Sequence, residues 1–92
     1  MSRTAPALAR IDTLLPVLQG LAAGSERDQL LANADALRRA VAAFHMEAIR
    51  FRMYSVERLL KTLRDPDAQR LFEELRADLE TAGFHTRSHT AP

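Results

Sequence analysis

Residues 26–64 read ERDQLLANADALRRAVAAFHMEAIRFRMYSVERLLKTLR and contain neither glycine nor proline. Most of these residues are good helix formers, and the chain has no Asn-Gly or Asp-Gly dipeptide of the kind that turns a β-hairpin. We therefore predict an all-α fold in which this stretch forms one long helix. At 1.5 Å per residue that helix is about 58 Å long. A compact chain of this size has a radius of gyration of only about 12 Å, so the helix must either break or be covered by another chain.

Start and stop signals on both sides of this stretch divide the rest of the chain. Gly24-Ser25 combines a C-cap glycine with a helix start, and Asp65-Pro66 places an N-cap aspartate before a proline at the first helical position. Gly83-Phe84 resembles a glycine C-cap followed by a hydrophobic residue that folds back. We predict a short-long-short chain with helices at about 12–23, 26–64 and 66–82. These form a single domain, 1–84, followed by a disordered polar tail, 85–92.

The apolar residues of the long helix cover about 200° of its circumference, twice the ~100° that one packing partner needs. The two short helices can cover only one side of it. We therefore predict a helical bundle formed by homodimerisation through the long central helix, with coiled-coil-like contacts. The predicted interface residues are Val41, Phe44, Ala48, Ile49, Met53 and Val56. The alternative is a break near residue 45 that folds one chain into a four-helix bundle, although no Gly, Pro or Asn cluster marks such a turn.

Three polar residues interrupt the apolar sector at intervals of seven: Arg38, His45 and Arg52. A buried arginine requires a partner. The two hairpin registers predict intrachain salt bridges from Arg38 to Asp12 and from Arg52 to Asp78. Two further interpretations stay open: a buried polar seam that fixes the register of a dimer, and an anion-binding or catalytic strip centred on His45.

His45-Met46-Glu47, in a predicted helical assembly, resembles the histidine phosphotransfer domains, four-helix bundles in which an exposed histidine is phosphorylated. The resemblance covers these three residues. It implies phosphorylation of His45. With the cations at intervals of seven, the alternative function is a small enzyme or phosphotransfer module that uses His45, with Arg38 and Arg52 as its anion site. The predicted position of His45 inside the apolar sector argues against access by a partner.

The charge pattern argues against nucleic-acid binding. The chain has 13 basic and 12 acidic residues, a net charge of +1, whereas nucleic-acid-binding proteins carry a marked basic excess on one face. Acidic neighbours, such as Glu47 near Arg50 and Glu57 beside Arg58, indicate a solvated helix face crossed by ion pairs. A nucleic-acid-associated protein is kept as a further alternative.

The remaining features favour a cytoplasmic, non-enzymatic protein. There is no cysteine, no apolar run of membrane-spanning length and no signal-peptide-like start. His85 and His89 have the spacing of zinc ligands on one helix but lack a third ligand nearby, so we expect no metal and no cofactor. The predicted function is a small helical protein-interaction or regulatory module that acts as a homodimer and binds another protein.

Overall fold

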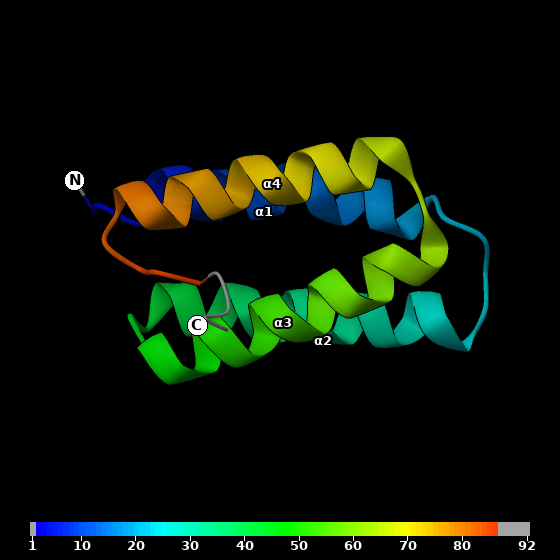
Figure 1. The fold of residues 1–92 in the computed structure, drawn as a ribbon, viewed down its shortest axis with the longest axis horizontal. Helices are drawn as coiled ribbons and strands as arrows, with labels where there is room; N and C mark the ends of the chain where they lie inside the picture. The colour runs from blue at the N-terminus through cyan, green and yellow to red at the C-terminus, as the bar shows by residue number, and fades with distance from the viewer. Residues whose placement is uncertain (1, 87–92) are drawn as a thin grey trace, which may run out of the picture.

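The structure, a computed structural model, describes residues 2–86, and within this range the regular secondary structure is entirely helical. The helices are α1 (Ala5–Gln19), α2 (Ser25–Ala42), α3 (Met46–Leu63) and α4 (Pro66–Thr81). They run alternately up and down, so each is antiparallel to the next (Figure 1). The all-α prediction is confirmed, and the architecture is a four-helix bundle within one chain.

The single helix predicted over 26–64 is wrong. It is divided into α2 and α3 by residues 43–45, so the alternative of a break near residue 45 is confirmed. The whole molecule measures 34 Å along its longest axis, too short for a straight helix of about 58 Å. The first helix also begins earlier than predicted, at Ala5 rather than near residue 12, and contains Pro16 in its interior.

The turn at residues 43–45 depends on two unusual backbone positions. Phe44 adopts a left-handed conformation, φ 57°, which is uncommon for a residue other than glycine. His45 is extended and serves as the N-cap of α3, where its Nδ1 accepts a hydrogen bond from the Ala48 backbone N–H at 3.3 Å. The backbone N–H of His45 donates to the Ala40 carbonyl at 3.0 Å, which closes the end of α2.

The two predicted signals around α4 are confirmed. The Asp65 carboxylate accepts a hydrogen bond from the Ala68 N–H at 2.9 Å, and Pro66 occupies the first helical position. At the other end Gly83 has φ 100°, and the Phe84 N–H donates to the Leu79 carbonyl at 2.8 Å. This arrangement folds Phe84 back so that only 5% of it is exposed.

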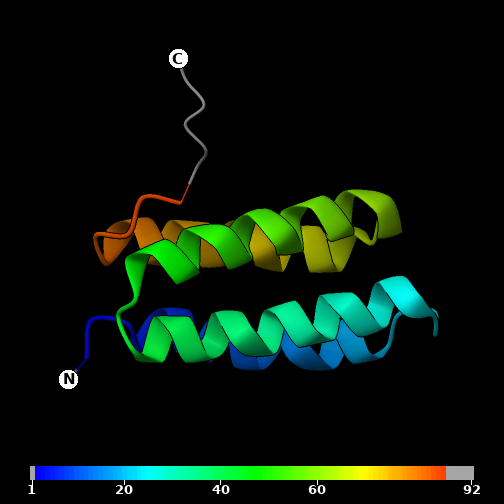
Figure 2. The same ribbon diagram turned by 90° about the horizontal axis from the view of Figure 1, so that it is seen from below.

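Each helix packs against its neighbours to a different extent. The contacts of α2 with α3 are the most extensive, followed by those of α1 with α4 and with α2, while α3 and α4 touch each other least. Figure 2 shows α3 and α4 on one side of the bundle and α1 and α2 on the other. Among neighbouring helices, the backbones of α3 and α4 are therefore the least closely packed.

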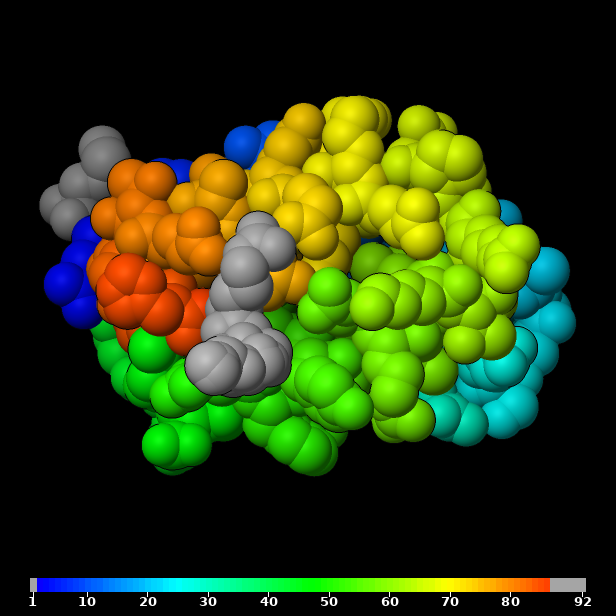
Figure 3. Space-filling view, in the orientation of Figure 1, coloured from blue at the N-terminus to red at the C-terminus, as the bar shows by residue number. Residues whose placement is uncertain are grey.

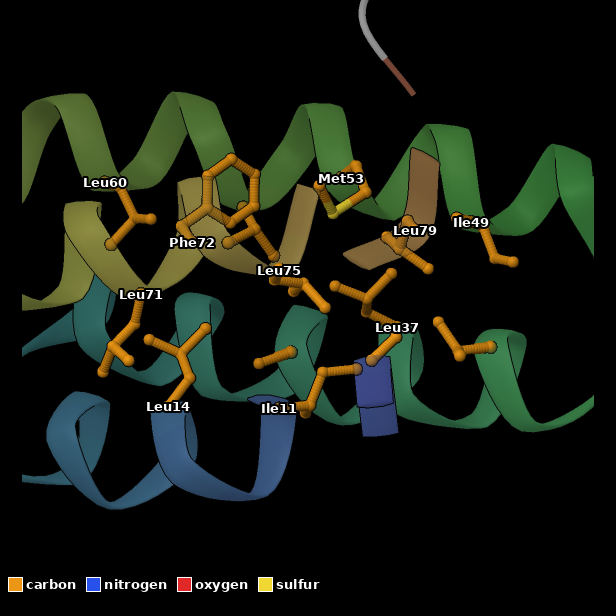
Figure 4. Packing of buried hydrophobic residues seen from close by; sticks show 14 of the residues in the cluster. Ile11, Leu14, Leu37, Ile49, Met53, Leu60, Leu71, Phe72, Leu75 and Leu79 are labelled. Atoms are coloured by element: carbon orange, nitrogen blue, oxygen red, sulfur yellow. The ribbon is translucent and has the colours of Figure 1, made fainter. Parts of the chain in front are cut away.

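One hydrophobic core joins all four helices (Figure 4). Its fully buried large side chains include Ile11 and Leu14 of α1, Leu37 of α2, Ile49 and Met53 of α3, and Leu75 and Leu79 of α4. Four of the predicted dimer-interface residues, Val41, Ile49, Met53 and Val56, are completely buried in this core, and Ala48 is partly buried. In this closed chain the four side chains therefore pack within one protomer, and the apolar surface that suggested a dimer is already covered. Phe44 is 48% exposed.

Part of the predicted polar tail is ordered. Thr86 is buried, so it does not belong to a disordered tail; residues 87–92 of the predicted tail lie outside the described residues. Of the helices in the described range, none combines the length and the apolar character needed to cross a membrane.

Candidate interaction surface on helix α3

The predicted pair between Arg38 and Asp12 is present. Arg38 Nε donates to Asp12 Oδ1 at 2.7 Å and Nη2 donates to Oδ2 at 3.1 Å, which links α2 to α1. The hydrogen bond from Arg38 lowers the pKa of Asp12 and raises that of Arg38 itself. The side chains are 40% and 53% exposed, so the predicted burial of Arg38 is wrong and the pair lies at the surface.

The predicted pair between Arg52 and Asp78 is wrong. Arg52 Nη1 donates to Asn33 Oδ1 on α2 at 2.8 Å. Asp78 instead accepts a hydrogen bond from Arg10 Nε on α1 at 2.9 Å, and Arg10 Nη1 bonds to Glu74 at the same distance. Because α4 packs more closely on α1 than on α3, its acidic edge meets α1.

The line of three polar residues is also corrected. The break after Ala42 places Arg38 on α2 and Arg52 on α3, with His45 exposed at the turn between them. No hydrogen bond or ion pair within residues 2–86 joins any two of the three. The geometry therefore does not assemble a buried polar seam or an anion site from them.

A different set of residues shares one exposed face of α3. An α-helix turns by 100° per residue, and on this basis five exposed residues of α3 fall within about 100° of the helix circumference. We call this set the α3 stripe: Arg50, Phe51, Tyr54, Arg58 and Lys61. Phe51 and Tyr54 are each 59% exposed. Arg52 lies beside the stripe with its guanidinium 5.0 Å from the centre of the Phe51 ring, which supports one face of that ring.

The cations of the α3 stripe differ from most others on the surface. On the other three helices, most arginines form ion pairs. Arg10 pairs with Glu74 and Asp78, Arg38 with Asp12, Arg39 with Asp35, and Arg70 with Glu74. Arg50, Arg58 and Lys61 make no ion pair with any residue in the 2–86 range. Glu47 also lies on this exposed face. The stripe therefore presents two aromatic rings among three cations that have no ion-pair partner within residues 2–86.

The expected ion pair between Glu57 and Arg58 is wrong, because Glu57 turns towards α4. Its Oε1 lies 3.1 Å from Arg76 Nη2. Arg76 is only 2% exposed and also donates from Nε to Glu73 and from Nη1 to the Thr86 hydroxyl, each at 3.2 Å. Its guanidinium lies 5.1 Å from the centre of the Phe72 ring. The acid nearest to Arg58 in sequence is thus engaged by a buried arginine.

A shallow groove between α3 and α4 adjoins the α3 stripe. One pocket in it is lined by Glu57, Leu60, Lys61, Gln69, Phe72 and Glu73. A second, lined by Tyr54, Glu57, Arg58 and Lys61, lies on the surface of α3 alone. Figure 3 shows this face, with α4 in yellow to orange above α3 in green. Because Lys61 lines both pockets and belongs to the stripe, groove and stripe form one continuous surface.

Sequence reasoning overlooked Arg76, although a signal was present. Arg76 stands four residues after Phe72 and three before Leu79, both of which belong to the apolar face of α4. Phe51 is one of the apolar residues of the predicted long helix, yet it is 59% exposed, because the bundle covers only the Ile49, Met53 and Val56 side of α3.

The described residues include no group of three His, Cys, Asp or Glu side chains that could hold a metal ion. This chain matches no protein-family model, no curated protein and no solved structure.

Proposed function

We propose that the protein is a small, non-enzymatic interaction module that binds an acidic, partly apolar segment of another protein through the α3 stripe. The observation that carries this proposal is the coincidence, on one helix face, of exposed Phe51 and Tyr54 with three cations that make no ion pair within residues 2–86. Aromatic residues and arginine are the residue types that most often dominate binding energy at protein interfaces.

Charge explains why the partner should be acidic. Carboxylates of a partner can pair with Arg50, Arg58 and Lys61, and apolar side chains can cover the two rings between them. Two copies of the stripe facing each other would bring like charges together, which disfavours self-association through this face.

Two features favour a protein partner over a nucleic acid. The net charge of the chain is +1, and Glu47 and Glu57 border the stripe. Binding to a phosphate backbone gains affinity with each cation that neutralises a phosphate, and it needs a larger positive excess than this surface has. A short segment with a few carboxylates needs only a few such pairs. The adjoining groove is lined by Leu60 and Phe72 together with Glu57, Lys61, Gln69 and Glu73, and the two acids among them disfavour a phosphate there.

The test begins with a selection from a displayed library of random 12-residue peptides on the full chain. We expect enriched peptides to combine Asp or Glu with aromatic or leucine residues. Their affinity should fall about tenfold or more in the double variant Arg58→Glu/Lys61→Glu, as measured by fluorescence anisotropy. A matched control is Arg39→Glu/Arg70→Glu, which changes the net charge equally on α2 and α4, where both arginines are already paired.

Three outcomes would overturn the proposal. One is the absence of acidic sequences among the selected peptides. Another is an equal loss of binding in both double variants, which would mean that net charge alone governs the interaction. The third is binding of a single-stranded oligonucleotide that depends on Arg58 and Lys61 while acidic peptides bind weakly, which would assign the stripe to nucleic acid.

The predicted homodimer and the cytoplasmic location stay predictions. The apolar residues that suggested the dimer are buried within one chain. Two closed chains therefore cannot dimerise by covering these residues.

A further inference from the structure

The turn between α2 and α3 is poorly matched to its own sequence. Residues 42–48, AAFHMEA, contain no glycine, proline or asparagine, and alanine is the strongest helix former. Phe44 is nevertheless held at φ 57°, where a side chain clashes with the backbone and glycine is favoured. The local sequence therefore favours a continuous helix, while the closed bundle imposes a turn.

Straightening this turn would separate the chain into two halves. One half contains α1 and α2, and the other contains α3 and α4. The core is shared between them, with Leu37 in the first half and Ile49 and Leu79 in the second, all completely buried. A straightened single chain would expose these side chains to water and could not persist alone.

A second straightened copy offers the same surfaces that the first has lost. We propose that residues 43–45 form a hinge through which two chains exchange their α3–α4 halves, giving a domain-swapped dimer with one continuous helix from Ser25 to Leu63 in each chain. The partner is thus a second copy of this chain, and the surface that receives it is the core-facing side of α1 and α2. The arrangement is symmetric, so it closes at two copies.

The exchange conserves nearly every contact described above. Among residues 2–86, side-chain hydrogen bonds join the two halves of the closed chain from Arg10 to Asp78, from Arg10 to Glu74 and from Arg52 to Asn33. In the swapped dimer each would form between chains instead of within one. Only the hinge differs, where left-handed Phe44 and the His45 cap are replaced by helical hydrogen bonds. Short hinge loops under strain are the sites at which such exchange occurs.

The first experiment compares Phe44→Ala with Phe44→Gly by size-exclusion chromatography with light scattering across a concentration series. Both variants remove the ring, which packs near Phe84 and Arg3 in the closed chain. They differ in backbone preference, because alanine favours the continuous helix and glycine favours the turn. We expect the dimer dissociation constant to be at least about a hundredfold lower for Phe44→Ala, because two hinges change in each dimer. Equal monomeric behaviour of both variants up to millimolar concentration would overturn the proposal.

The second experiment distinguishes exchange from a dimer made by surface contact. In the Arg10→Glu variant, the closed chain places Glu at position 10 beside Asp78, so two acids meet. In the Asp78→Arg variant, it places Arg at position 78 beside Arg10, so two bases meet. A swapped heterodimer of the two variants restores both opposite-charge pairs. After joint refolding from urea, we expect a heterodimer that melts above either variant alone. A mixture that melts as the simple sum of its components, whatever its oligomeric state, would contradict the exchange.

Discussion

Arg38 binds both carboxylate oxygens of Asp12, with Nε 2.7 Å from Oδ1 and Nη2 3.1 Å from Oδ2. The bond spans α1 and α2 and is the arrangement in which guanidinium and carboxylate geometries match best. Its two partners are 26 residues apart in sequence, and the antiparallel register of the first hairpin brings them together.

The first prediction concerns the titration of Asp12. The hydrogen bond from Arg38 lowers the Asp12 pKa in the folded chain below its unfolded value of about 3.9. The pair therefore contributes stability above that unfolded value, and the contribution is lost as pH falls through the folded pKa. In Arg38→Ala we expect the Asp12 pKa to rise towards its ordinary value, as followed by carbon-detected NMR of the carboxyl group. Arg39→Ala, which removes the partner of Asp35, is the control and should leave the Asp12 titration unchanged.

The second prediction separates the two pairings considered for Asp78. A double-mutant cycle on Arg10 and Asp78 should show a favourable coupling energy, because their side chains form a hydrogen bond at 2.9 Å. The corresponding cycle on Arg52 and Asp78 should show coupling close to zero, since Arg52 bonds to Asn33. Urea unfolding of the single and double alanine variants measures both. The reverse pattern would restore the pairing first predicted from the hairpin register.

These two pairs show what the sequence could predict and where it failed. The Arg38–Asp12 pair followed from a short connection between two antiparallel helices, a local constraint. The Arg52–Asp78 pair failed because the same register argument assumes that α3 and α4 pack closely, whereas α4 contacts α1 more. The preference of α4 for α1 depends on how all four helices share one core. The register of a single hairpin gives no information about that packing.

The helix boundaries follow the same division between local and global causes. Asp65-Pro66 and Gly83-Phe84 carry their own capping chemistry, and the structure confirms both. The break at Phe44 carries none, because the core and not the local sequence imposes it. Because the sequence predicted that the whole apolar sector of one long helix is covered, the exposed face of α3 could not be identified from it, and the α3 stripe was not found.

The third prediction concerns Arg76, the most deeply buried charge among residues 2–86. Arg76→Ala removes its ion pairs with Glu57 and Glu73 and the packing of its stem beside Phe72, and we expect a loss of about 3 kcal/mol of stability. The loss stays below that of a fully buried pair because both carboxylates keep access to water. Arg70→Ala on the same helix is exposed and should change stability by less than about 1 kcal/mol. Equal effects of the two changes in urea unfolding would show that Arg76 is solvated.

A further prediction on Arg76 isolates its contact with the chain end. Thr86→Val keeps the shape of the side chain but removes the hydroxyl that accepts a hydrogen bond from Arg76 Nη1 at 3.2 Å. Because Thr86 is buried, the stranded donor should cost about 1 kcal/mol. In the Arg76→Ala background the same substitution should cost nearly nothing. A full cost in both backgrounds would mean that Thr86 acts through packing alone.

The last prediction tests whether the aromatic rings of the α3 stripe serve the fold. Phe51 and Tyr54 are each 59% exposed, whereas Phe72, also aromatic, is 2% exposed. Phe72→Ala should therefore cost about 3–5 kcal/mol in urea unfolding, because it leaves a cavity in the core. Phe51→Ala and Tyr54→Ala should each change stability by no more than about 0.5 kcal/mol, as surface substitutions do. Folding stability then gives no reason for two large rings to face water, and their loss should appear only as weaker binding of the selected acidic peptides. If either substitution instead destabilises the chain as strongly as Phe72→Ala, that ring belongs to the core and the α3 stripe loses its apolar centre.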